Sequence, residues 1–101
     1  MGTIRIEFYR DQPQNTVAGD TIYGRLISSV EDATTSTTPE HATIPGGAVY
    51  ARVVGTEAHY VECGVGNQSV ATGRRALALA GAPYDLSIAP TDTRISYASV
   101  A

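Results

Sequence analysis

Apolar and polar residues alternate along several short stretches of the chain, and this period of two is typical of β-strands with one buried face. The clearest stretch is 3–10, where Ile4, Ile6 and Phe8 share one face and mostly polar or charged side chains share the other. Comparable stretches rich in Val, Ile, Thr and Tyr follow along the chain. We expect strands at 3–10, 21–30, 48–55, 58–65, 74–80, 84–89 and 93–100.

Segment 74–80 carries a competing helical signal, because it consists of Arg, Ala and Leu. It is too short for a stable isolated helix, and Leu77 and Leu79 alternate, so we interpret it as a strand. Turn signals separate the strands. They include Pro45-Gly46-Gly47 and residues 89–92, where Pro90 takes the second position of a type I turn.

The pattern as a whole predicts an all-β fold, a single antiparallel β-sandwich or jelly roll of about seven to eight short strands. The chain has 101 residues, which leaves room for one domain, residues 1–101. The residues expected to face its core are Ile4, Ile6, Phe8, Val49, Val53, Val61, Cys63, Leu77, Leu79, Leu86 and Ile88.

Residues 31–47 differ from the rest, because they hold five Thr, two Pro and two Gly and few side chains that a core could bury. We expect an extended Thr/Pro-rich loop or arm here. A loop of more than about 12–15 residues in a small domain is usually functional or disordered. Three interpretations remain open: a loop without a role, an arm that becomes ordered on a partner, and a short extra strand around Thr43–Ile44.

Charge excludes some partners. The net charge is −3, and the positive charges are seven Arg scattered along the sequence, without a Lys. A nucleic-acid binder carries clustered positive charge, so we expect neither nucleic acid nor an anionic membrane as the main partner. No apolar run approaches the length of a membrane span, and the first residues lack the pattern of a signal peptide.

The sequence offers little catalytic chemistry. His59 and Cys63 lie four residues apart on one face of an expected strand, which separates them by about 13 Å and excludes a dyad or a shared metal. We interpret Cys63 as a buried, unreactive thiol, because it shares its face with Val61 and Val65, and His59 as a rim or surface histidine. We therefore expect no enzyme, no cofactor and no metal.

Two groups of residues are candidates for contacts with a partner. One is the Thr-rich segment, and the other is the Arg74-Arg75 doublet, whose side chains point to opposite faces if the segment is a strand. The chain also has six Tyr, a residue type favoured at protein interfaces. The expected partner-interface residues are Thr34, Thr35, Thr37, Thr38, Pro39, His41, Thr43, Arg74 and Arg75.

The second half of the chain, from about Ala48, resembles small structural proteins of tailed bacteriophages and related gene-transfer particles. The resemblance rests on an Ala/Val/Arg strand (AVYARVVGT), a strand ending in Gly (HYVECGVG) and a polar turn (NQSVATGRR), followed by LALAGAPYDLSIAP and DTRISYASVA. The Pro-Gly-Asp-Arg turn usual in such proteins reads Pro90-Thr91-Asp92-Thr93-Arg94 here. The first half of the chain does not contribute to the resemblance.

The resemblance implies a non-enzymatic cement protein that decorates and stabilises a capsid lattice. It implies a virion location on the capsid surface after synthesis in the bacterial host cytoplasm, with the major capsid protein or another virion protein as partner. It also implies a homo-oligomer, a trimer on three-fold positions. The alternatives are a head-spike, adaptor or tail component, and a carbohydrate-binding β-sandwich module with Tyr60, Glu62 and Tyr84 on a concave face.

Overall fold

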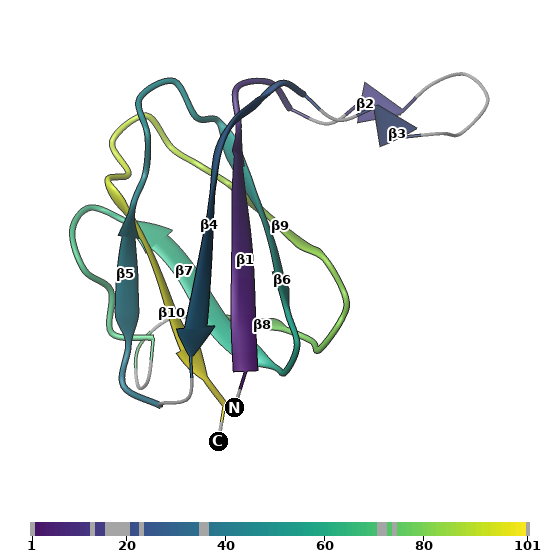
Figure 1. The fold of residues 1–101 in the computed structure, drawn as a ribbon. Coiled ribbons are helices and arrows are strands. Elements are labelled where there is room, and N and C mark those ends of the chain that lie inside the picture. Colours follow the sequence, from purple (N-terminus) through teal and green to yellow (C-terminus); the bar gives the residue numbers. More distant parts are fainter. Residues whose placement is uncertain are drawn as a thin grey trace.

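Two antiparallel sheets of four strands each pack face to face in the computed structural model (Figure 1). The structure describes residues 2–12, 14–15, 21–22, 24–34, 37–70, 73 and 75–100. The first sheet has the order β4 (Leu26–Thr34), β1 (Gly2–Tyr9), β6 (Tyr50–Gly55) and β9 (Tyr84–Ser87). The second has the order β5 (Glu40–Thr43), β10 (Arg94–Ser99), β7 (His59–Gly64) and β8 (Ala76–Ala78).

This arrangement confirms the predicted all-β fold, a small antiparallel β-sandwich. The two remaining strands, β2 (Gln14–Asn15) and β3 (Thr21–Ile22), pair only with each other. The described residues contain no helix that is long and apolar enough to cross a membrane.

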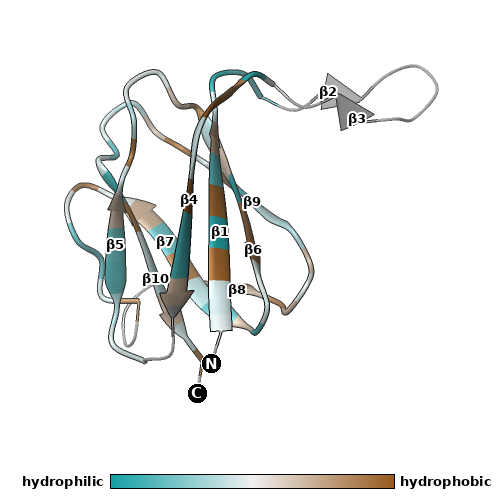
Figure 2. Cartoon of the chain, in the orientation of Figure 1, coloured by the Kyte–Doolittle hydropathy of each residue, from teal (hydrophilic) through white to brown (hydrophobic). Residues whose placement is uncertain are grey.

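The core lies between the sheets and follows from the alternation in the sequence. Along β1, apolar residues point inward and alternate with polar ones, which Figure 2 shows as bands along the strand. Ile6, Phe8, Val53 and Val61 have no exposed surface and Ile4 has almost none, so these five predictions are confirmed. Three other residues expected in the core pack against it while partly buried: Cys63, Leu86 and Ile88.

Three core predictions are wrong. Leu77 and Leu79 are 47 % and 59 % exposed, and Ala76 and Ala78 pack toward the core instead. The reason is the register of β8 against β7. Leu77 lies opposite Tyr60 on the outer face, whereas Ala78 lies opposite His59, which is itself buried. Val49 precedes β6, is half-buried and lies outside the core cluster.

The strand bounds between residues 21 and 47 differ from the expected strand 21–30 and the expected loop 31–47. Residues 21–22 pair with β2, and β4 begins at Leu26 and continues to Thr34, into the segment that we expected to be a loop. Residues 40–43 form β5, so of the three interpretations of 31–47 the extra strand is nearest to the structure. The Pro45-Gly46-Gly47 turn is present: Ala48 N–H donates to the Pro45 carbonyl, and Gly47 has φ of 87°.

The β2–β3 hairpin stands away from the sandwich, beyond one end of β1 and β4 (Figure 1). Its base is fixed where the chain leaves and rejoins the sheet. Arg10 N–H donates to the Arg25 carbonyl at 2.8 Å, and the Arg25 guanidinium pairs with Asp11 at 3.4 Å. The start of β1 and the end of β10 both lie at the opposite end of the sandwich (Figure 1). The sandwich therefore presents two distinct ends.

The two sides of the sandwich are closed by different means. Next to β8 and β9, backbone contacts join the sheets: Gly55 and Ala80 form an isolated parallel bridge, and Gly81 N–H donates to the Gly55 carbonyl at 2.8 Å. On the other side, β4 and β5 are the edge strands of the two sheets, and neither has a second neighbour among the described strands.

Candidate functional site

The expected interface residues do not form one group. Thr37, Thr38 and Pro39 lie in the connection from β4 to β5, Thr34 ends β4, and His41 and Thr43 are exposed on β5. Arg75 lies beside β8, at the far side of the same sheet from β5. Thr35 and Arg74 lie outside the described residues.

His41 and Arg75 share a structural task instead: they hold residues 65–70, which follow β7, over the outer face of the second sheet. His41 acts through Ser96, whose Oγ lies 2.6 Å from its Nδ1. Arg75 donates from Nη1 to the Val70 carbonyl at 3.1 Å, and its guanidinium lies 3.6 Å from the centre of the Tyr60 ring. Such a cation–π contact favours a fixed position for the arginine.

This covered face contains residues that the sequence analysis missed. Val70 and Ser96 have no exposed surface, and Ala98 is 1 % exposed, although Ser96 and Ala98 point away from the main core. Ser96 Oγ also accepts the Gln68 N–H at 3.0 Å. A signal was available: β10 and the residue after it carry no charge beyond Arg94, which is typical of a strand buried on both faces.

The Ser96–His41 pair has the residue types of a nucleophile and its base, but not the access. A catalytic serine must reach a substrate with its hydroxyl group. The Ser96 side chain has no exposed surface, and its oxygen is already bonded to the Gln68 backbone. The pair therefore acts as a clamp for the β7–β8 connection.

The prediction for His59 is wrong, because its side chain is buried rather than at the rim. Its Nδ1–H donates to the Glu57 carbonyl at 2.7 Å, which fixes the turn between β6 and β7. A Cβ atom on Gly55 would come within 2.6 Å of this nitrogen, so the imidazole needs a glycine at that position.

Cys63 is partly buried against the core. Burial, followed by the negative charges of Asp92 and Glu62, raises the pKa of its thiol to about 12. The thiol is therefore protonated at neutral pH, which is unfavourable for nucleophilic chemistry and for metal binding. Among the described residues, no three His, Cys, Asp or Glu side chains lie close enough together to hold a metal ion.

The outer face of the first sheet carries a network of charges. The Arg5 guanidinium pairs with Glu7 at 3.1 Å and with Glu31 at 2.7 Å, and its pKa is raised by hydrogen bonds to Glu31 and Glu7. Burial, with the hydrogen bond from its hydroxyl to Glu7 at 2.8 Å, raises the pKa of Tyr9 to about 12. The positive charge of Arg5 is thus already compensated, which makes it a poor anion site.

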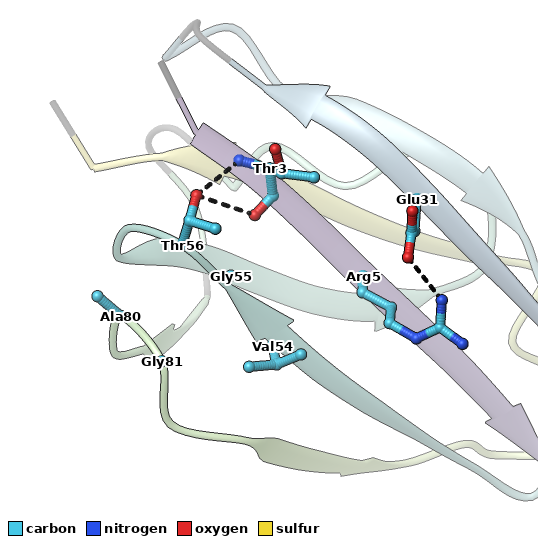
Figure 3. Close-up of a pocket in the computed structure, with 8 residues that line it drawn as sticks. All are labelled: Thr3, Arg5, Glu31, Val54, Gly55, Thr56, Ala80 and Gly81. Atoms are coloured by element: carbon cyan, nitrogen blue, oxygen red, sulfur yellow. Dashed lines mark hydrogen bonds and ion pairs between the residues drawn. The ribbon is translucent and has the colours of Figure 1, made fainter.

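A shallow hollow of about 620 Å³ lies beside this network (Figure 3). Val54, Gly55, Ala80 and Gly81 provide apolar and backbone surface, and the Arg5–Glu31 ion pair forms part of its wall. None of the described residues that line the hollow is aromatic. Its composition suits a small apolar or neutral group better than an ion.

The expected sugar-binding face is not formed. Tyr60 and Glu62 lie on β7, on the outer face of the second sheet, while Tyr84 lies on β9 in the first sheet. Arg75 covers the Tyr60 ring, which removes the flat surface that a sugar would need.

No protein-family model matches this chain, and neither the curated proteins nor the solved structures contain a significant match.

Proposed function

We propose that this chain is a non-enzymatic cement protein that decorates and stabilises the capsid lattice of a phage-type particle. The proposal takes its class from the resemblance over the second half of the chain. The observation that supports it most is the β2–β3 hairpin, which extends away from the sandwich (Figure 1). A strand pair that stands away from its own sandwich is suited to contacts with a neighbour, and in this proposal it takes the place of segment 31–47 as the arm.

The β4 strand supports the proposal as a second contact. Thr3 and Tyr9 carbonyls accept hydrogen bonds from Thr56 and Val49, so the odd-numbered residues of β1 bond to the β6 side. The even-numbered residues therefore bond to β4. In β4, the backbone N–H and C=O groups of Ser29, Glu31 and Ala33 then point to the open edge, where a partner strand can pair with them.

Hairpin and edge together fit a head-to-tail assembly. If the hairpin of one copy meets the β4 edge of the next, the contact is heterologous and closes into a ring when the rotation allows it. Three copies on a three-fold position of the lattice is the form that the resemblance implies. Many weak contacts repeated over a shell then act multivalently.

The test replaces residues 13–23 with two glycines, which leaves the Arg10–Arg25 base of the hairpin intact. We expect the shortened protein to fold with unchanged far-UV circular dichroism but to lose binding to capsids of the particle encoded beside its gene. The absence of a major capsid gene in that neighbourhood, or full capsid occupancy by the shortened protein, would contradict the proposal. A cryo-EM map of the particle distinguishes a cement protein from a spike, adaptor or tail component.

A further inference from the structure

Arg10 lies at the base of the β2–β3 hairpin, directly after β1, and its side chain is exposed. The other arginines that the structure describes all make side-chain contacts within the chain. These contacts are the ion pairs of Arg5, Arg25 and Arg52, the ring contact of Arg75 and the hydrogen bond of Arg94. Within the described part of the chain, the Arg10 guanidinium has no hydrogen bond, ion pair or ring contact. It is therefore available for a contact with another molecule.

The backbone of Arg10 is fixed although its side chain is unpaired. Its N–H donates to the Arg25 carbonyl at 2.8 Å across the base of the hairpin. The neighbouring carboxylate of Asp11 does not compensate its charge, because Asp11 pairs with the Arg25 guanidinium at 3.4 Å. A guanidinium stays charged at physiological pH and fits a carboxylate with two parallel N–H groups. The chemistry that suits Arg10 is therefore an exposed carboxylate on a neighbouring molecule.

Such a carboxylate lies at the open edge of the first sheet. Glu31 belongs to β4, which has no second neighbour among the described strands, and its side chain is 62 % exposed. Glu31 shares the Arg5 guanidinium with Glu7, at 2.7 Å and 3.1 Å respectively. One cation between two carboxylates leaves this network with a net charge of −1. A carboxylate has two acceptor oxygens, so Glu31 can accept hydrogen bonds from a second guanidinium.

We propose that Arg10 of one copy binds Glu31 of the next copy, and that this ion pair orients the head-to-tail contact between the hairpin end and the β4 edge. The inference rests on the proposed function, which brings these two surfaces together. Within one copy the two residues cannot pair. Glu31 lies opposite Arg5, and five residues of strand separate Arg5 from Arg10, which is about 16 Å. The contact therefore joins two different surfaces, as a heterologous assembly requires.

The same charges disfavour the main alternative, in which the β4 edges of two copies pair with each other. That pairing brings together two surfaces of net negative charge, each with one Arg5 between Glu7 and Glu31. Like charges placed together across an interface oppose binding, whereas complementary charges select the partner and its orientation. The ion pair thus favours the hairpin end of the next copy over a second β4 edge.

The experiment is a charge exchange. Analytical ultracentrifugation compares self-association of the wild type, Arg10→Glu, Glu31→Lys and the double variant at about 1 mM protein, where weak contacts are populated. We expect each single change to lower the association constant at least about 10-fold, and the double variant to recover to within about 3-fold of the wild type. Arg5 keeps Glu7 as its partner in Glu31→Lys. Arg94→Glu makes the same charge change on the second sheet and should associate like the wild type.

Equal association of the wild type and Arg10→Glu overturns the proposal, and so does a double variant that associates no better than Arg10→Glu. If the wild type is monomeric at this concentration, the same proteins are compared for capsid occupancy and the same two outcomes decide. Loss of capsid binding by Glu31→Lys alone, with Arg10→Glu unaffected, overturns the contact between copies and assigns the β4 edge to a basic strand of the capsid protein. The protein with the shortened hairpin keeps Arg10, so its result tests the proposed function separately. A monomeric wild type that binds no capsid contradicts both proposals.

Discussion

Phe8 has no exposed surface, whereas 59 % of the surface of Leu79 is exposed. Truncation to alanine should therefore cost much more stability at Phe8 than at Leu79. We expect Phe8→Ala to reduce the free energy of unfolding by about 3–5 kcal/mol, because it leaves a cavity between the sheets. Leu79→Ala should change it by no more than about 0.5 kcal/mol. Urea unfolding followed by circular dichroism measures both. A large loss for Leu79→Ala would mean that β8 has the register expected from the alternation.

Cys63 provides a second test with a single side chain. Because its pKa is raised to about 12, almost no thiolate exists at pH 8. We expect an aromatic disulfide reagent to label the folded protein at least about 100-fold more slowly than the urea-unfolded chain, whose thiol has a pKa of about 8.5. Equal rates in the two states would show a reactive thiol. Loss of capsid binding in a folded Cys63→Ala variant would also contradict an inert role.

The β7–β8 connection is the element whose position depends most on a few polar contacts. Ser96→Ala removes the oxygen that receives the Gln68 N–H and that lies beside His41. We expect a loss of about 1–3 kcal/mol in unfolding free energy, because a buried donor is left without a partner. Amide exchange of residues 65–70 should become faster, since the clamp on the outer face is gone.

Ser87→Ala is the matched control for this prediction, because Ser87 lies exposed on β9. Its effect should stay within about 0.5 kcal/mol, without faster exchange in residues 65–70. If Ser96→Ala exchanges like Ser87→Ala, the connection is held by Val70 burial and the Arg75 contacts alone.

The β4 edge gives a prediction about pairing between copies. Ser29→Pro removes an N–H that points to the open edge, and Pro is tolerated on edge strands with that orientation. We expect this variant to fold and to lose binding to the particle, whereas Ser29→Ala keeps the N–H and should bind like the wild type. Binding by both variants in a sedimentation assay would show that β4 does not receive a partner strand.

For the individual strands, the alternation of apolar and polar residues predicted where most strands lie. It did not predict all of their end residues, nor which face of β8 points to the core. Ile4, Ile6 and Phe8 were predictable because β1 is long and its two faces differ in polarity. In β8, Leu and Ala alternate, and the register against Tyr60 and His59 decides which faces inward, a long-range contact that local hydrophobicity does not encode. Segment 31–47 appeared loop-like because β5 is a short edge strand whose side chains are mostly polar and exposed.

For the whole molecule, the candidate site was harder to predict than the fold. His41 and Arg75 were named for a partner, yet the structure uses both within one sheet. The Tyr97 hydroxyl donates to Asp32, 65 residues away in sequence, and no local sequence pattern predicts a contact over that separation. The class of partner still depends on the resemblance.

The assembly prediction also belongs to the whole molecule. We expect copies of this protein to touch one another on the particle, in groups of three, through the hairpin and β4. A monomer in dilute solution does not contradict this, because the lattice itself raises the local concentration. A particle map in which neighbouring copies make no contact would contradict this prediction.

The position of β10 has a consequence for the order of events during folding. β10 comes last of the ten strands along the chain, yet it lies in the middle of the second sheet, between β5 and β7. Until residues 94–99 are present, β5 and β7 have no common partner, so the second sheet cannot assemble without this strand. The second sheet therefore forms cooperatively around β10, and pairings this distant in sequence place the folding rate in the slow range of small domains, about milliseconds to seconds.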